Sequence, residues 1–128
     1  NILITGGAGY IGSAIFYLLL KKKLNNIVDK LIYKKKNYPK KSILFKLNIS
    51  DLFSVKKIIK KYKINSVIHF AAYKDVEESI LKPEKYHKNN YLITKKFIQC
   101  CKDNGVRNFI FSSSAAVYGN TIKNKKVT

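Results

Sequence analysis

The sequence predicts an α/β fold with a doubly wound parallel sheet, because short apolar runs alternate with stretches of helical length along the whole chain. The first run, residues 2–4, has no polar interruption, which is typical of a strand buried on both faces. Glycines follow at positions 6, 9 and 12, and an apolar stretch of helical length then runs to Lys21. Strand, glycine-rich turn and helix in this order form the context in which dinucleotides are bound.

Each glycine of this turn has a predicted purpose. Gly6 permits the tight turn, Gly9 lets the backbone approach a pyrophosphate, and Gly12 lets the helix pack close to the strand. The spacing is G-x-x-G-x-x-G, and the alternative is a glycine-rich surface turn without a ligand. Asp29 favours the interpretation as a dinucleotide-binding turn, because it ends the next apolar run, 17 residues after Gly12. A carboxylate there can bond the ribose hydroxyls of NAD and repel the 2′-phosphate of NADP.

The remaining elements follow in order. We expect further strands at residues 26–29, 42–47, 66–70 and 108–112, and helices after residue 51, at 75–81 and at 83–103. Ser50 or Asp51 can cap the first of these helices. Pro83 starts the longest one, and Asn104 with Gly105 stops it. The right-handed crossover rule then predicts the strand order 3-2-1-4-5, with helices on both faces of the sheet.

Polar candidates gather at one edge of this predicted sheet. Open parallel sheets bind ligands at the carboxyl ends of their strands. The strand ends are residues 6–12, Asp29, Asn48, residues 70–74 and residues 112–114. His69, at the end of a buried strand, is interpreted as a packed structural residue rather than an acid or base.

Composition limits the class of protein. A chain of 128 residues can bury one modest core, so we expect one domain at most. The net charge is +19, but every basic residue except Arg107 is lysine, which favours solvated faces over a nucleic-acid surface. No apolar run is long enough to span a membrane. We therefore expect neither nucleic acid nor a membrane as partner, and no signal peptide, because the chain opens directly on its first strand.

The cysteines indicate a reducing compartment. Cys100 and Cys101 are neighbours in a helical stretch and cannot easily meet disulfide geometry, so we expect them reduced in a cytoplasmic protein. Two Cys and two His are scattered without ligand spacing, so we expect no metal site.

Residues 5–12 resemble the extended short-chain dehydrogenase/reductases that act on nucleotide sugars. The segments 69–79, 82–83, 89–90 and 109–119, with Tyr86, are most similar to the UDP-glucose 4-epimerase family. The resemblance spans the whole chain but only the N-terminal part of that family's protein. It therefore implies a Rossmann-like NAD-binding domain over residues 1–128, truncated before the last strands and the substrate domain, and a homodimer when complete.

The resemblance also implies a set of site residues. The cofactor NAD would be held by Gly6, Gly9, Tyr10, Ile11, Gly12, Asp29, Asn48, Ile49, Phe70, Ala71, Lys74 and Asn89, and Ser114 would be the catalytic serine that bonds the sugar hydroxyl. Two positions depart from the family pattern. Asn48 replaces the usual Asp, although its carbonyl can still accept from the adenine amino group. Lys30 replaces the usual Asn beside Asp29, which slightly weakens the case against NADP.

The activity implied by the resemblance is the interconversion of UDP-galactose and UDP-glucose by transient oxidation of the sugar at C4. This chemistry needs a Tyr-x-x-x-Lys pair after the fifth strand, in which the lysine lowers the tyrosine pKa. The matches Tyr17…Lys21 and Tyr91…Lys95 both precede Ser114, and we interpret them as chance pairs. We therefore expect the 128-residue chain to be inactive by itself.

Other interpretations stay open at this stage. The chain can belong to another nucleotide-sugar dehydratase or reductase of the same superfamily. It can also be a non-catalytic module that binds NAD or a polyanion, or the product of a decaying gene.

Overall fold

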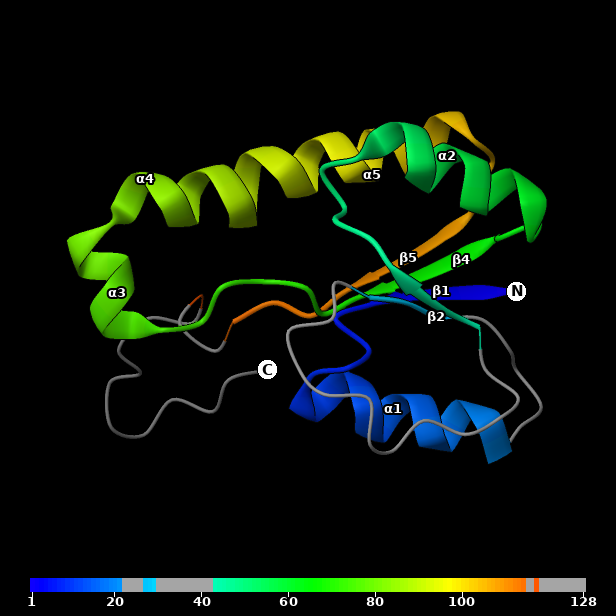
Figure 1. Ribbon diagram of the computed structural model, residues 1–128, viewed down its shortest axis with the longest axis horizontal. Helices are drawn as coiled ribbons and strands as arrows, with labels where there is room; N and C mark the ends of the chain where they lie inside the picture. The colour runs from blue at the N-terminus through cyan, green and yellow to red at the C-terminus, as the bar shows by residue number, and fades with distance from the viewer. Residues whose placement is uncertain (22–26, 30–42, 115–116, 118–128) are drawn as a thin grey trace.

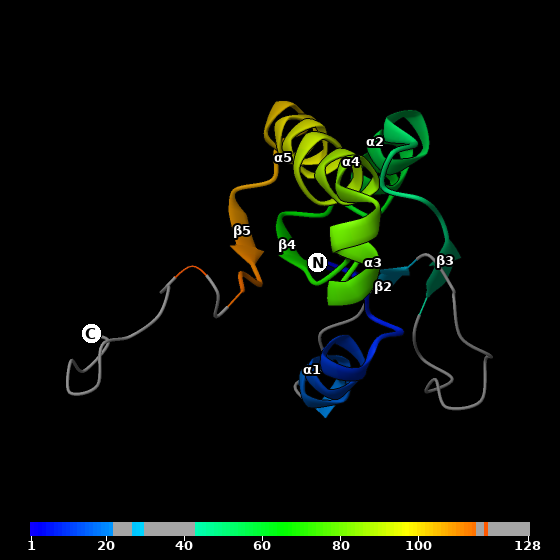
Figure 2. The same cartoon turned by 90° about the vertical axis from the view of Figure 1, so that its left-hand side faces the viewer.

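The computed structural model describes residues 1–21, 27–29, 43–114 and 117. In chain order the elements are β1 (Ile2–Thr5), α1 (Tyr10–Lys21), β2 (Ile27–Asp29), β3 (Leu44–Lys46), α2 (Leu52–Lys61), β4 (Ser66–His69), α3 (Val76–Leu81), α4 (Pro83–Tyr86), the π-helical η1 (His87–Ile93), α5 (Thr94–Asp103) and β5 (Asn108–Phe111). The strands form a central layer, with α1 on one face and with α2 and α5 on the other (Figure 1). Figure 2 shows β5 and β3 at the two edges of this layer. The predicted α/β fold with helices on both faces is confirmed.

Every described strand pair is parallel. Leu3 of β1 lies opposite Val67 of β4, which in turn lies opposite Phe109 of β5. β2 and β3 form a second parallel pair with Val28 opposite Phe45. β2 lies beside β1, in keeping with the order 3-2-1-4-5, but the hydrogen-bonded ladders divide into β1-β4-β5 and β2-β3. The strands therefore lie in the predicted order, although no ladder joins β1 to β2 in the described residues, where β2 and β3 are three residues long each.

The main core lies between the sheet and the helices α2 and α5. Its buried side chains are Leu3, Ile49, Val55, Ile59, Ile64, Val67, Phe97 and Cys101. A smaller cluster on the other face joins Ile4 of β1 to Phe16 of α1. This division explains why a strand such as β1 needs apolar side chains on both faces.

The helix boundaries follow local hydrogen bonding. Asp51 caps α2, because its carboxylate accepts a hydrogen bond from the N–H of Ser54 at 3.1 Å. Asp75 caps α3 through the N–H of Glu78 at 2.8 Å. The predicted helix over 83–103 is one continuous helical rod, but its middle part, η1, is π-helical. Such a wide turn is rare and often marks a functional site.

The surface carries the positive charge. Every lysine side chain that the structure describes is exposed. Among the described residues, no helix is long and apolar enough to cross a membrane.

The core predicts a stability difference between two phenylalanines. Phe97 is 0% exposed and its ring contacts His69 and Phe109, whereas Phe53 on α2 is 69% exposed. Phe97→Ala should lower the free energy of unfolding by about 3–5 kcal/mol, because it removes a fully buried ring and leaves a cavity. Phe53→Ala, the matched control, should cost less than about 1 kcal/mol. Urea denaturation of the protein measures both, and similar losses would contradict this account of the core.

Candidate functional site

The glycine turn after β1 is closely packed against its surroundings. Gly6 has a φ of +69°, and a Cβ atom there would lie 2.8 Å from the backbone N of Ala71 and the backbone C of Phe70. A Cβ atom at Gly12 would overlap the carbonyl oxygen of Gly6. Only glycine fits either place, because a left-handed φ and a backbone contact both exclude side chains. The turn therefore brings the start of α1 and the segment after β4 together, as expected for Gly6 and Gly12.

The N-terminus of α1 opens at this turn. The N–H of Ser13 donates to the carbonyl of Gly9 at 2.9 Å, the first bond of the helix. The N–H groups of residues 10–12 precede that bond and have no acceptor within the helix. Tyr10 is 89% exposed and Ile11 is 56% exposed, so this end of the helix faces open surface. Such an end, with its positive dipole, suits an anionic ligand.

The ends of the central strands are tied together by hydrogen bonds. The N–H of Phe70 donates to the carbonyl of Thr5 at 2.9 Å, and the N–H of Ser112 donates to the carbonyl of His69 at 3.1 Å. The N–H of Ala71 approaches the hydroxyl of Thr5 at 3.4 Å. The predicted gathering of candidates at the carboxyl edge is thus realised for the segments after β1, β4 and β5.

His69 lies at the centre of this edge and is 1% exposed. Its Nδ1 lies 2.6 Å from the Thr5 hydroxyl and its Nε2 lies 3.3 Å from the Thr94 hydroxyl. Burial lowers the pKa of His69 to about 4, so the ring is neutral at pH 7, with one donor and one acceptor nitrogen. The sequence-based interpretation of a packed structural histidine is confirmed. Thr5 and Thr94, its partners, carried no signal in the sequence beyond their place near strand and helix ends.

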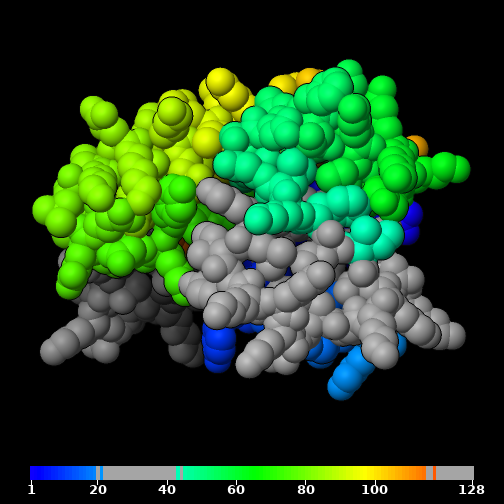
Figure 3. Space-filling model, in the orientation of Figure 1, coloured from blue at the N-terminus to red at the C-terminus, as the bar shows by residue number. Residues whose placement is uncertain are grey.

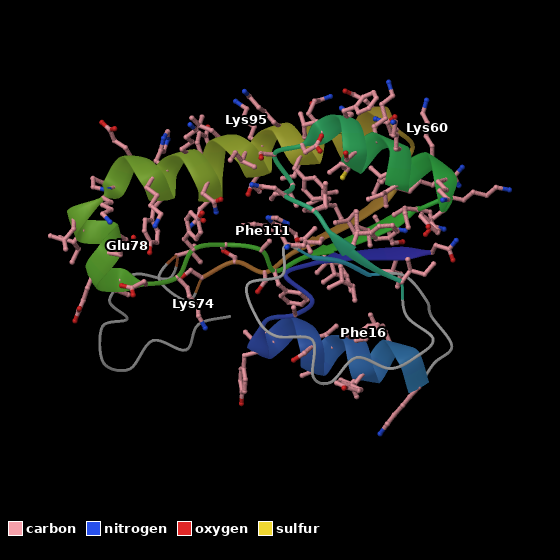
Figure 4. All side chains as sticks on the ribbon, viewed as in Figure 1. Phe16, Lys60, Lys74, Glu78, Lys95 and Phe111 are labelled. Atoms are coloured by element: carbon pink, nitrogen blue, oxygen red, sulfur yellow. The ribbon has the colours of Figure 1, made fainter. Side chains whose placement is uncertain are left out.

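The π-helical η1 holds the segment after β4 in place. The side chain of Asn90 accepts from the N–H of Tyr73 at 2.9 Å and donates to the carbonyl of Tyr73 at 2.8 Å. Asn89, the predicted cofactor residue, donates to the Asn90 side chain at 2.9 Å. Asn90 was not among the residues predicted to contribute to the site, although an Asn-Asn pair in a helix interior is an unfavourable choice that can signal such a contact. Lys74 follows Tyr73 directly and is exposed (Figure 4).

The candidates after β3 occupy different environments. Asn48 is exposed, and its side-chain oxygen accepts from the N–H of Ser50 at 3.1 Å. Ile49 is buried in the main core, so only its backbone is available to a ligand. Asp29 is the last residue of β2, at the same edge as the glycine turn, and its side chain lies outside the described part of the structure.

Ser114 lies three residues beyond the end of β5. β5 stops at Phe111, and Ser114 is exposed, with its carbonyl accepting from the N–H of Val117 at 3.2 Å. The ladder ends there because its partner β4 stops at His69, which lies opposite Phe111. The predicted end of the strand at residue 112 was therefore wrong by one residue, and the serine run follows the strand.

The two Tyr-x-x-x-Lys matches, which the sequence led us to interpret as chance pairs, lie on helices. Tyr17 and Lys21 lie on α1, and Tyr91 lies in η1. The ammonium of Lys95 sits over the ring of Tyr91, 6.0 Å from its centroid. Among the described residues, no group of three or more His, Cys, Asp or Glu side chains is placed to hold a metal ion. Both cysteines are free, and burial raises the pKa of the Cys101 thiol to about 12, so this thiol is unreactive at pH 7.

Comparison with known proteins identifies the family to which this chain is similar. The model of the NAD dependent epimerase/dehydratase family matches residues 2–128. UDP-glucose 4-epimerase of Lactobacillus helveticus is 41% identical over 121 residues, which cover 93% of this chain and 37% of that protein. The chain thus spans little more than a third of that relative's length.

Two solved structures share the fold. UDP-glucose 4-epimerase of Thermus thermophilus in complex with NAD is 30% identical, with a TM-score of 0.90 over 99% of this chain and 42% of that one. The Thermotoga maritima enzyme with UDP-glucose is 31% identical, with a TM-score of 0.86 over 96% of this chain and 41% of that one.

Burial of His69 predicts a pH-dependent stability. The folded state keeps the ring neutral down to about pH 4, whereas the unfolded chain takes up a proton near pH 6.5. Stability from this residue is complete above pH 6.5 and is lost as the pH falls, by about 3 kcal/mol at pH 4. Urea denaturation between pH 7 and pH 4 measures the loss.

Two variants separate this loss from the titration of carboxylates. His69→Gln keeps a donor and an acceptor but takes up no proton, so its unfolding free energy should vary less with pH than that of the unmodified protein. His87→Gln, at an exposed position in η1, should leave the dependence in place. An unchanged pH dependence in His69→Gln would show that the buried ring is not its source.

Proposed function

This chain belongs to the NAD dependent epimerase/dehydratase family, and we propose that it forms the NAD-binding part of a UDP-glucose 4-epimerase. The full-length protein would interconvert UDP-galactose and UDP-glucose. Similarity to epimerases of three bacteria supports the reaction, and two of those proteins were solved with NAD or UDP-glucose. The chain spans between 37% and 42% of these relatives, so the activity is proposed for the full-length protein.

The observation that carries the proposal is the glycine turn at the N-terminus of α1. Gly6 and Gly12 leave no room for side chains, and the helix end beyond them faces open surface. These features fit a pyrophosphate, which needs close backbone approach and N–H donors. Asp29 ends the neighbouring strand β2, where it would meet the adenosine ribose and disfavour a 2′-phosphate.

The other candidates take roles along the same edge. Phe70, Ala71 and Lys74 would line the cofactor, Asn89 would approach it from η1, and Asn48 with the backbone of Ile49 would meet its adenine end. Ser114 would bond the 4-hydroxyl of the sugar and pass its proton toward the tyrosine of the Tyr-x-x-x-Lys pair expected after the fifth strand in the full-length protein. Bound NAD would accept the hydride from C4 of the sugar and return it to the opposite face of that carbon. The chain's own residues would therefore hold the cofactor and orient the hydroxyl that loses its proton.

Two measurements on the full-length protein test the proposal. Isothermal calorimetry should show NAD binding, and UDP-galactose should be converted to UDP-glucose without net consumption of NAD. Binding without conversion would indicate a non-catalytic NAD module. Conversion of the nucleotide sugar to a dehydrated product would indicate a dehydratase of the same family.

Asp29 should set the preference for NAD over NADP. Asp29→Ala removes the charge that repels a 2′-phosphate, so the ratio of the two dissociation constants should shrink by about tenfold, or ~1.4 kcal/mol. Calorimetry with both cofactors measures this ratio. Asp103→Asn removes the same charge at the C-terminal end of α5, at the opposite edge of the sheet, and should leave the ratio unchanged. If the two variants behave alike, Asp29 does not contact the ribose.

Ser114 should matter for turnover more than for cofactor binding. Loss of one aligned hydrogen bond in the transition state should lower kcat on the order of 10²-fold in Ser114→Ala. NAD affinity should change little, because the glycine turn and Asp29 hold the far end of the cofactor. Ser113→Ala is the neighbouring control and should be milder. Full kcat in Ser114→Ala with a loss in Ser113→Ala would shift the assignment by one residue, and full kcat in both would remove the serine from the mechanism.

A further inference from the structure

Glu78 contacts three polar side chains at the junction of two helices. Its Oε1 lies 2.6 Å from the ammonium of Lys85 and 3.4 Å from that of Lys82, and its Oε2 accepts a hydrogen bond from the hydroxyl of Tyr86 at 3.0 Å. Hydrogen bonds from Lys85, then from Tyr86, hold the pKa of Glu78 below its usual range. We call these four residues, Glu78, Lys82, Lys85 and Tyr86, the Glu78 cluster. It crosses the junction between α3 and α4.

The cluster continues onto the ring of Tyr73. The rings of Tyr73 and Tyr86 are 5.6 Å apart, and the ammonium of Lys85 sits 4.9 Å from the centroid of the Tyr73 ring. The backbone of Tyr73 is bonded on both its N–H and its carbonyl by Asn90. Tyr73 is thus held by its side chain from the cluster and by its backbone from η1. Lys74, the next residue, takes its position from Tyr73.

No apolar core holds this part of the chain. Among the described residues of α3 and α4 none is buried, and the apolar side chains of α3, namely Val76, Ile80 and Leu81, are exposed. These two helices form one end of the molecule (Figure 3), at the edge where the strands end (Figure 1). A helix of six residues has no stability of its own in water. The polar contacts of the Glu78 cluster therefore decide where α3 lies.

We propose that Glu78 is a positioning residue, which holds Lys85 and Tyr86 against Tyr73 and thereby fixes Lys74 at the ligand edge of the sheet. This inference rests on the proposed function, in which Lys74 lines the cofactor. Figure 4 shows Glu78 on α3 and Lys74 on the segment that leads into it. Isolated exposed ion pairs contribute little to stability, so the cluster acts through geometry more than through overall stability.

The first test follows the backbone and needs no ligand. The N–H of Tyr73 donates to the side chain of Asn90, and its hydrogen exchange should be roughly tenfold faster in Glu78→Ala, because the ring of Tyr73 loses its support. Glu77→Ala is the matched control: it removes an exposed carboxylate of the same helix for which the described residues show no ion pair. Glu78→Gln, which keeps an acceptor for Tyr86, should lie between the two. Equal exchange in all three variants would overturn the inference.

The second test asks whether Glu78 acts through Lys74. In the full-length protein, Glu78→Ala should raise the dissociation constant for NAD and lower kcat/KM by roughly tenfold, since small displacements of a positioned group are costly. In a Lys74→Ala background the same change should have no further effect, as expected for two residues that work as a unit. Equal losses in both backgrounds would overturn the inference. Absence of NAD binding and of epimerisation in the unmodified protein would instead overturn the proposed function, and the exchange measurement would still decide whether Glu78 holds Tyr73.

Discussion

The hydrogen bond between Thr5 and His69 is the contact on which the ligand edge depends. A buried imidazole is kept neutral, so each ring nitrogen must find a partner of the right kind, and the two threonine hydroxyls provide them. Thr5 ends β1, His69 ends β4, and Thr94 begins α5. The ring of Phe111, at the end of β5, stacks on His69 at 5.7 Å. One side chain therefore fixes the relative positions of three strand ends and a helix.

The two faces of the sheet differ in how much apolar surface they bury. The face under α2 and α5 holds most of the buried apolar side chains, including Phe97, and provides most of the stability. The face under α1 has a smaller cluster around Phe16, and what matters there is how closely α1 approaches the turn at Gly6. This close approach requires glycine at positions 6 and 12. The chain therefore has no side chains to pack at the place where the phosphates of a ligand would need backbone N–H donors.

The segment after β4 is held differently again. Its contacts are polar: the paired bonds of Asn90 to Tyr73, and the Glu78 cluster that packs on the ring of Tyr73. Each polar contact at a surface contributes little to stability, but hydrogen bonds and ion pairs have preferred directions, so several of them together fix a geometry. These contacts can therefore position Lys74 while it stays exposed. The wide turn of η1 belongs to the same arrangement, because it carries Asn90, which holds Tyr73, and Asn89, whose amide donates to the Asn90 side chain.

The sequence by itself determined the alternation of strands and helices and the glycine turn, since each depends on local periodicity or on backbone conformations available to few residue types. It left the cap of α2 open between Ser50 and Asp51, and the structure shows Asp51. The sequence also indicated that His69 is buried, because a polar residue at the end of an apolar run belongs to the same buried strand. Only the tertiary structure decided which groups satisfy that histidine, that Ile49 is buried, and that β5 stops at Phe111. Those outcomes depend on partners 25 to 64 residues away in the chain and on where a neighbouring strand ends. No local pattern encodes such contacts, because they arise when distant segments meet around a shared core.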